Sequence, residues 1–558
     1  MGKNHLASLV ITALLVACGG GGSGSSTGGN NPAPSPPPPD PLNLVEAARF
    51  SSQATFGLNY EEIESLAKMG REAWLQQQFS LPVGWHTTTV DELIVRREAG
   101  EFEAYEDDVE LLAQFRRLAW WNCAVTCGDV LRQRVAFALS EILVVSDKVD
   151  TLIVFPYALS TYYDMLLEHS FGNYKDLLHE AALHPAMGIY LSHLNNRKSD
   201  PFANTFPDEN FAREIMQLFS IGLFELNIDG SSRVDGSGNP IATYNNADIR
   251  EFAKVFTGLS WGGPSAFFGR DLPYFRAPMK MFDEFHEQGS KELLGTSLSA
   301  GQTGEEDFDA AIDVLFNHAN VGPFIGKQLI QRLVTSNPSP SYIQRVATIF
   351  NDDGNGVRGN LQAVIQQIFT DPEAIAAPDP SSEFGKLREP AVRFLNMLRK
   401  FGATSDDGFI ANSGYLIQEL GRQHPLSSPS VFNFFLPAHS PPGEIAAAGL
   451  VAPEFEIVNS GTIVNMLNLL DYSLFGDSAT DSPEPFGKVR LELGALESLA
   501  NDVDALIDNL DIVLTNGGAS EETREVIRGV LIDLDSNPLR VKLGIYMFMM
   551  SADYVIRI

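Results

Sequence analysis

The segment FPDENFAREIMQLFSIG (residues 206–222) gathers charged and amide side chains and then becomes apolar. On a helix, at about 100° per residue, its apolar side chains fall on one side. The polar side chains occupy an arc of roughly 140° that carries Glu209, Asn210, Arg213, Glu214 and Gln217. Pro207 suits the first helical position, because a first-turn amide needs no partner. We therefore predict an amphipathic helix that begins at Pro207 and buries one side.

Apolar residues recur at helical spacing through most of the chain from about residue 43. Several segments also begin with residues that cap helices. These are Asn59 with Glu62, Asp129 before LRQRVAFALSEILVV, Ser520 before EETREVIRGVLIDL, and Pro538 at the opening of LRVKLGIYMFMM. The sequence predicts a mainly α fold.

Signals for β-strands are sparse. Residues 226–244 carry Gly-rich turns and predict one or two hairpins, whereas residues 260–290 are expected to be irregular. Residues 476–487 are the best candidate for a mobile loop. We expect a large multi-helix globular body with one or two short β-hairpins and long irregular loops.

The first 18 residues, MGKNHLASLVITALLVAC, have the pattern of an export signal. A basic Lys3 precedes an apolar run that is too short to span a bilayer. The ending Leu-Val-Ala-Cys is similar to a bacterial lipoprotein signal, so we expect residues 1–17 to be a signal peptide and Cys18 to be lipidated. Gly19 follows the cysteine where Asp would indicate retention, and this resemblance implies an outer-membrane lipoprotein that is periplasmic or surface-exposed.

Residues 18–42 comprise this cysteine and a Gly/Ser/Pro-rich tether, GGGGSGSSTGGNNPAPSPPPPDPL. Such composition cannot build a core and serves as a spacer. No internal repeat or sharp change in composition divides the rest. Residues 43–558 are therefore expected to form a single large, mainly helical domain.

The net charge of the chain limits which classes of partner it is expected to bind. The chain of 558 residues holds 39 basic and 71 acidic residues, a net charge of −32, and 44% of it is hydrophobic. Nucleic-acid affinity depends on neutralising phosphates with Lys and Arg, so a nucleic-acid partner is not expected. The apolar content is ample for a large core. The expected membrane contact is made through the lipid on Cys18 and not through basic residues.

Cys123 and Cys127 remain after Cys18. An oxidising compartment favours a disulfide that closes a small turn ahead of the helix after Asp129. Free thiols are the alternative. A metal or redox role lacks partners, since the sequence has no CxxC and no CxxCH haem site.

Common catalytic and cofactor motifs fail on spacing. HEAALH (179–184) places its histidines five residues apart, about 140° around a helix, where a zinc protease needs four. GNGVRG (354–359) follows a predicted helix where a dinucleotide fingerprint follows a strand. The sequence has no phosphate loop and no nucleophile elbow. We expect no nucleotide or haem, whereas a divalent metal stays open.

Candidate site residues come from the polar arc of residues 209–217 and from histidines around it. Glu209, Arg213, Glu214 and His286 are the candidate catalytic residues, with His286 lying in FDEFHEQGSK. Asn210, Gln217, Asn195 and Arg197 are the candidate substrate-binding residues. His184, His193 and His286 are candidate metal ligands. The alternative is structural: an acidic first turn, and histidines that cap or pack.

Several ordered stretches resemble the bacterial domain of unknown function 1800 family. They include LRQRVAFALSEILVVS, PDENFAREIMQLFSIGL, KLREPAVRFLNMLR and PSVFNFFLPAHSPPGEIAAAGLVAPEF. The resemblance covers nearly the whole body. It implies an exported bacterial protein, often encoded beside a sulfatase-like protein that becomes a candidate partner. It implies no established activity.

Two functions remain open, and the sequence does not decide whether the protein is an enzyme. The first is a membrane-tethered lipoprotein that binds or assembles a surface polymer or a partner protein. The alternative is an extracytoplasmic, metal-assisted hydrolase in which His193 and His286 converge on the polar arc of residues 209–217. The missing catalytic motif favours the first.

Overall fold

The computed structural model describes residues 40–557 except 103–107, 264–266, 268–273, 378, 380–382, 411–413 and 477–485. The predicted signal peptide, Cys18, nearly all of the tether and most of the predicted loop at 476–487 lie outside the described residues. Contacts divide the chain into residues 1–38 and residues 39–558. The fold below is that of the second unit.

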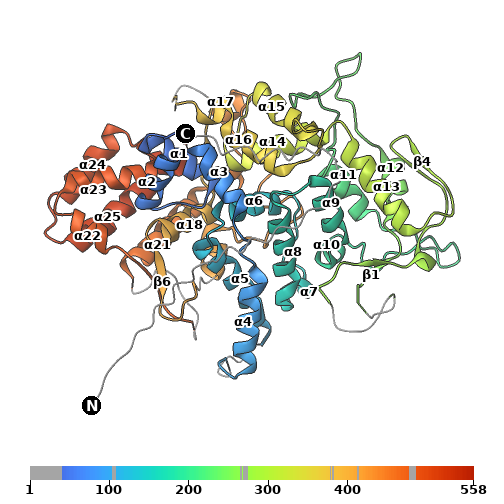
Figure 1. Ribbon diagram of the computed structural model, residues 1–558, viewed down its shortest axis with the longest axis horizontal. Helices are drawn as coiled ribbons and strands as arrows, with labels where there is room; N and C mark the ends of the chain where they lie inside the picture. Colours follow the sequence, from blue (N-terminus) through green and yellow to red (C-terminus); the bar gives the residue numbers. More distant parts are fainter. Residues whose placement is uncertain are drawn as a thin grey trace, which may run out of the picture. The chain divides into compact units, whose positions relative to one another are not determined.

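The described body contains 26 α-helices, which confirms the predicted mainly α fold (Figure 1). The helices of its first half are α1 (Leu44–Ala54), α2 (Tyr60–Met69), α3 (Arg71–Ser80), α4 (His86–Glu98), α5 (Asp108–Thr126), α6 (Val130–Ser140), α7 (Asp150–Val154), α8 (Pro156–His169), α9 (Tyr174–Leu183), α10 (Pro185–Tyr190), α11 (Asn210–Gln217) and α12 (Asn246–Val255).

The second half continues with α13 (Gly304–Asn317), α14 (Val321–Leu333), α15 (Pro340–Asn351), α16 (Leu361–Thr370), α17 (Pro372–Ile375), α18 (Pro390–Lys400), α19 (Gly414–Gly421), α20 (Glu444–Ala447), α21 (Ser460–Phe475), α22 (Gly494–Leu499), α23 (Val503–Leu510), α24 (Glu521–Leu531), α25 (Asn537–Met550) and α26 (Ala552–Val555). Short 3₁₀ turns η1 (Asp283–Phe285) and η2 (Pro453–Glu456) and a π turn η3 (Asp511–Thr515) interrupt them.

Capping residues explain where many helices begin. Asn59 and Glu62 form the predicted capping box of α2, and Ser520 caps α24 through the amide of Thr523. Helix α25 begins at Asn537, one residue before the predicted Pro538, because the Ser536 side chain accepts an early amide of the helix.

The strands form four two-stranded antiparallel sheets among the described residues. They pair β1 (Leu259–Ser260) with β2 (Lys280–Met281), β3 (Lys291–Leu293) with β4 (Thr296–Leu298), β5 (Lys386–Leu387) with β8 (Ile556–Arg557), and β6 (Ala403–Ser405) with β7 (Val489–Leu491). The register sets Lys291 opposite Leu298 and Lys386 opposite Arg557. Sheets this short position loops and do not build a layer.

The predicted hairpins at 226–244 exist as two tight turns held by isolated bridges. Leu226 bridges Ser232 around Gly230, and Val234 bridges Pro240. Gly230 has φ +77°, a left-handed conformation that favours glycine. The segment returns to the body where Phe224 bridges Ala242.

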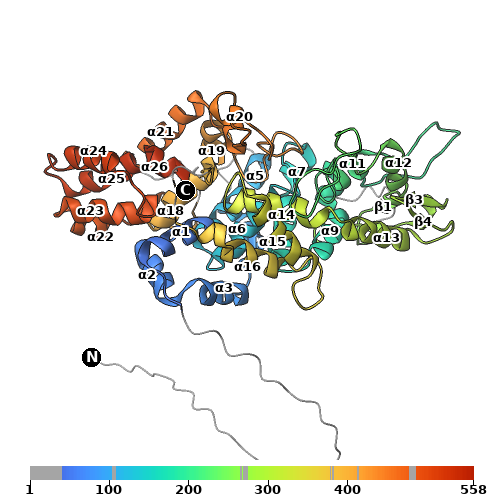
Figure 2. The ribbon, with the colours of Figure 1, turned by 90° about the horizontal axis from the view of Figure 1, so that it is seen from above.

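The core consists of one large apolar cluster that runs through most of the helices and a smaller one around Phe102 and Phe115. Helix α14 lies within the large cluster and packs against α15 and α6, as Figure 2 shows for α14 and α15. Leu329, Ile330 and Leu333 of α14 are fully buried. Its remaining side is polar, with Lys327, Gln328, Gln331 and Arg332. Helix α14 therefore supplies both core and candidate site.

Candidate functional site

Helix α11 carries the predicted polar arc, but the prediction that it begins at Pro207 is wrong. The Asn196 side chain holds the preceding segment, accepting the Asp208 N–H at 2.9 Å. The Asp208 carboxylate in turn accepts the N–H of Asn210 at 2.8 Å. These two bonds fix Asp208 outside the helix, and Glu209 becomes the N-cap residue without a side-chain cap bond.

The two sides of α11 differ as predicted at most positions. Phe211, Ile215 and Met216 are buried in the core. On the polar side, Glu209 and Arg213 approach to 3.7 Å, with 41% of each side chain exposed. An exposed pair of this kind contributes at most about 1 kcal/mol.

Glu214 differs from its polar neighbours because it is buried, with 6% of the residue exposed. Its Oε2 has no hydrogen-bond partner among the described residues. Burial raises the pKa of Glu214, and nearby Arg213 opposes the change. Gln217, one turn further, accepts a hydrogen bond from the Tyr244 hydroxyl at 3.4 Å.

His193 does not reach the polar arc of α11. Its ring stacks on Phe211 with the ring centroids 3.8 Å apart, on the apolar side of the helix. Its Nε2 lies 2.8 Å from the carbonyl oxygen of Ala182, and burial lowers the pKa of His193 to about 4. The predicted convergence is not observed for this histidine, because an imidazole also packs well on an aromatic ring.

His184 caps helix α10. Its Nδ1 accepts the N–H of Ala186 at 3.2 Å, and its ring meets Tyr162 edge-on at 5.1 Å between centroids. Burial lowers the pKa of His184 to about 3. These contacts match the structural alternative for a His-Pro helix start.

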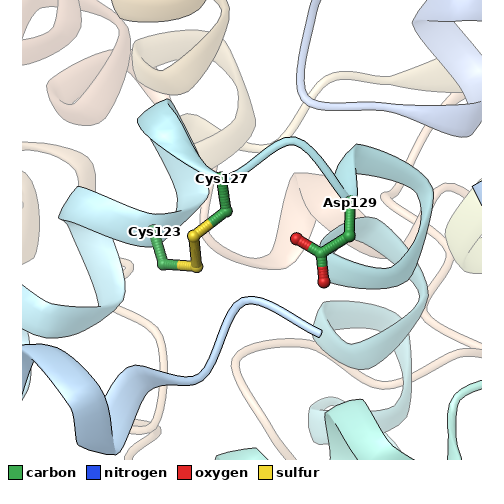
Figure 3. Close-up of side chains that lie close together, drawn as sticks. All are labelled: Cys123, Cys127 and Asp129. Atoms are coloured by element: carbon green, nitrogen blue, oxygen red, sulfur yellow. A yellow bond between two sulfur atoms is a disulfide. The ribbon is translucent and has the colours of Figure 1, made fainter. Parts of the chain in front are cut away.

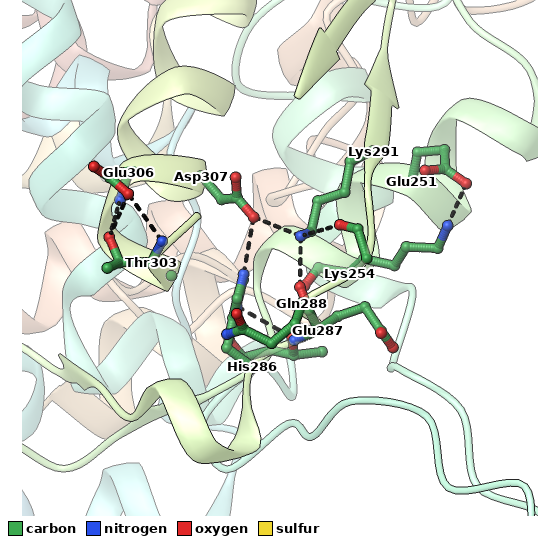
Figure 4. Close-up of polar contacts among 12 residues, drawn as sticks. Glu251, Lys254, His286, Glu287, Gln288, Lys291, Thr303, Glu306 and Asp307 are labelled. Carbon is green, nitrogen blue, oxygen red and sulfur yellow. Dashed lines mark hydrogen bonds and ion pairs between the residues drawn. The ribbon is translucent and has the colours of Figure 1, made fainter. Parts of the chain in front are cut away.

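His286 belongs to a buried group that we name the His286 cluster, consisting of His286, Lys291 and Asp307 (Figure 4). Asp307 Oδ2 lies 3.0 Å from His286 Nε2 and 2.5 Å from Lys291 Nζ. The other ring nitrogen lies 2.9 Å from the carbonyl oxygen of Thr257. The cluster joins the end of α12, the loop after η1, strand β3 and helix α13. Among the described residues, none of these partners belongs to α11.

The three candidate metal ligands do not meet in one ligand shell. Within the part of the chain that the structure describes, the single group of three ligating side chains holds no histidine and consists of Cys123, Cys127 and Asp129. The roles proposed for His184, His193 and His286 stay predictions without a shared site.

The two cysteines of that group form the predicted disulfide (Figure 3). Cys123 lies in the last turn of α5 and Cys127 follows its end, so the bond closes a turn at the end of α5, ahead of α6 as predicted. Asp129 accepts the N–H of Gly84 at 3.0 Å. Bonded sulfurs supply no thiolate for a metal.

The predicted substrate-binding residues outside α11 lie in the loop before it. Asn195 has φ +66°, and its side chain accepts a hydrogen bond from Ser260 Oγ at 2.6 Å. Arg197 is exposed two residues later. Asn195 therefore holds the loop to β1. Asn210 is exposed at the start of α11.

A cavity of about 570 Å³ lies beyond the C-terminal end of α11. It is lined by Gln217 and Leu218, by the hairpin segment 222–232, by α14, and by residues 431–438 with Val451. Four of its lining hydrophobics are 43–48% exposed and form an apolar rim: Leu223, Phe224, Phe432 and Leu436. Its buried lining residues form the floor.

Polar groups of α14 border the cavity and are not fully paired. Lys327 is half-buried, and burial lowers its pKa. It has no hydrogen bond or ion pair within the described parts of the chain. Gln328 is buried, and its Nε2 lacks a partner among the described residues. By contrast, Gln331 Nε2 donates hydrogen bonds to the carbonyl oxygens of Ser336 and Pro437.

A second buried ionic group begins at the cavity floor. We name it the Glu141 cluster: Glu141, Arg332, Lys386, Glu389 and Glu454. Glu141 and Arg332 line the cavity, with Arg332 Nε 3.8 Å from Glu141 Oε2. Lys386 contacts Glu454 and lies 3.7 Å from Glu389. Asn433 donates to Glu141 Oε1 at 3.2 Å.

The carboxyl groups of this cluster differ in protonation. Burial, and then the charge of Glu389, raise the pKa of Glu141 to about 8. Although burial opposes it, Lys386 holds the pKa of Glu389 below its ordinary value. Glu141 is therefore mostly a neutral acid at pH 7, beside an ionised neighbour.

Sequence reasoning missed these residues. Glu141 sits within the apolar run FALSEILVV, and Lys327 within VGPFIGKQLIQRL, which reads as an ordinary buried helix. The one available signal was KLREP, where Lys386 and Glu389 precede a helix at a spacing that allows an ion pair.

A family profile described as a protein of unknown function (DUF1800) matches residues 49–556. The chain belongs to this family. No curated protein and no solved structure matches this chain. Three of the stretches by which this DUF1800 protein resembles its family supply residues that line the cavity, namely Glu141, Gln217 with Leu218, and Phe432. A fourth supplies Lys386 and Glu389 of the Glu141 cluster.

Among the described residues of this DUF1800 protein, no helix is both long enough and apolar enough to cross a bilayer.

Proposed function

We propose that this DUF1800 protein is an exported lipoprotein that binds an extracytoplasmic ligand, a surface polymer or a partner protein, through the cavity beside α14. The cavity is the observation that carries this proposal. Its volume of about 570 Å³ lies within the range of ligand sites, which are mostly apolar with a few placed polar groups.

The exposed rim supports a binding role. Leu223 and Phe224 come from the hairpin segment, and Phe432 and Leu436 come from residues 431–438 of the lining. Large hydrophobic side chains left in water around one hollow favour association with an apolar partner surface. Covering them on binding removes apolar area from water, which contributes about 25 cal/mol per Å².

The sequence supports the location. The lipoprotein pattern ending at Cys18 and the tether to residue 42 would hold the body away from a membrane, where it could meet a large ligand. The disulfide between Cys123 and Cys127 is consistent with an oxidising compartment.

The test uses N-phenyl-1-naphthylamine, a neutral aromatic dye that fluoresces in apolar sites. The full chain is purified with Cys18→Ser, so that no lipid competes for the dye. We expect saturable binding that Ala438→Trp weakens about tenfold, or 1.4 kcal/mol, because an indole at this exposed lining position fills the mouth.

The matched control is Ala447→Trp, the same change at an exposed position of α20 outside the cavity lining. It should bind the dye like the parent chain. If the parent chain does not bind the dye, or if both tryptophan variants behave alike, the cavity is not the binding site.

One observation favours the hydrolase alternative in a changed form. Glu141 lies on the cavity floor with its pKa raised to about 8, and its Oε2 has no hydrogen-bond partner among the described residues, as a general acid requires. Glu141 thereby joins the predicted candidates Glu209 and Glu214, of which Glu209 is exposed beside Arg213. We expect turnover of at least one 4-nitrophenyl ester, phosphate, sulfate or glycoside, reduced about 100-fold or more in Glu141→Gln. Absence of turnover, or unchanged turnover in this variant, would exclude the role.

A further inference from the structure

The polar part of the cavity holds donors that have no partner among the described residues. Lys327, Gln328 and Arg332 of α14 all line it. Within the described structure, Lys327 has no counterion, and Gln328 Nε2 is buried without an acceptor. Leaving a donor or a cation partly buried and unpaired costs free energy that a ligand can recover.

Glu141, the acid in the same lining, does not cancel the positive charge of Lys327. Glu141 is mostly neutral at pH 7, because burial and Glu389 raise its pKa to about 8. Its other neighbour in the lining, Arg332, is a buried cation. The lining therefore holds two cations, Lys327 and Arg332, and one acid, while the ionised Glu389 lies outside it, although the whole chain carries −32.

We propose that the cavity takes an amphipathic anion, with one negative group beside Lys327 and Gln328 and an apolar body against Phe324 and the rim. This inference rests on the proposed function and names the chemical class of the ligand. The anion supplies the missing counterion of Lys327 and an acceptor for Gln328 Nε2. Charge-assisted hydrogen bonds of this kind are about twice as strong as neutral ones.

Two dyes with the same aromatic body separate charge from apolar burial. They are 1-anilinonaphthalene-8-sulfonate, which is an anion, and neutral N-phenyl-1-naphthylamine. For each dye, the affinity of the cavity is taken from the part of the binding that Ala438→Trp removes. The sulfonate should bind about tenfold more tightly than the neutral dye. Lys327→Gln should weaken the sulfonate about tenfold and change the neutral dye less than twofold. Lys327→Arg should restore most of the loss.

The control is Lys68→Gln on α2, an exposed lysine outside the lining, which should leave both affinities unchanged. Retained binding of the neutral dye shows that Lys327→Gln is folded. If that variant binds the sulfonate as the parent does, or loses both dyes equally, the anion proposal is overturned while the cavity stands. If the parent binds neither dye, the proposed function fails first.

Discussion

Two buried ionic clusters of this protein differ in what lies beside them. In the His286 cluster, a single carboxylate, Asp307, faces two basic side chains, and none of the three lines the cavity. In the Glu141 cluster, three carboxyl groups share two cations, Arg332 and Lys386, and two members border a cavity. The first cluster joins segments of the fold, whereas the second has two members in the lining of a cavity. His286 thus belongs to a cluster that holds segments together, and its catalytic role stays a prediction, whereas Glu141, within an apolar run of the sequence, lines a cavity.

The largest effect is expected in the His286 cluster. Asp307→Ala would leave Lys291 buried without its carboxylate and should lower the free energy of unfolding by about 3–5 kcal/mol. Urea unfolding followed by circular dichroism measures this. The control is Asp309→Ala on the same helix, whose carboxylate is 67% exposed beside His179, and it should cost less than about 1 kcal/mol. Equal losses in the two variants would show that Asp307 has no special role.

The pH dependence of stability tests the Glu141 cluster. The unfolded chain releases the Glu141 proton near its ordinary pKa of 4.5, whereas the folded chain keeps it to about 8. The unfolded state therefore binds fewer protons in this window, so the contribution of Glu141 falls as pH rises. Between pH 5 and pH 8 the decline should be on the order of 3 kcal/mol relative to Glu141→Gln, which cannot ionise.

The exposed Glu98→Gln on α4 is the control and should follow the parent curve. A parent curve parallel to that of Glu141→Gln across the window would mean that Glu141 is ionised in the folded protein. The contrast between the two clusters would then lose its electrostatic basis.

Much of the fold could be predicted from sequence because its signals are local. Capping residues such as Asn59 and Ser520 marked helix starts, and the spacing of Phe211, Ile215 and Met216 gave the buried side of α11. The start of α11 could not be placed, since Asn196, 12 residues before Asp208 in the preceding loop, decides it.

The site was harder to predict because it is not local. Its lining joins residues as far apart as Glu141, Lys327 and Phe432, and no sequence period connects them. Closeness in sequence also suggested shared sites that the structure does not show. His184 and His193 are neighbours along the chain, yet one caps α10 and the other stacks on Phe211. The roles predicted for Glu209, Arg213 and Glu214 stay predictions, with buried Glu214 lying one turn before the cavity residue Leu218.

The most direct test of the cavity as the binding site is a crystal structure with N-phenyl-1-naphthylamine bound. We predict electron density for the dye against Phe324, between Phe224 and Phe432 of the rim. Dye density at another surface, with this cavity filled only by solvent, would contradict the account.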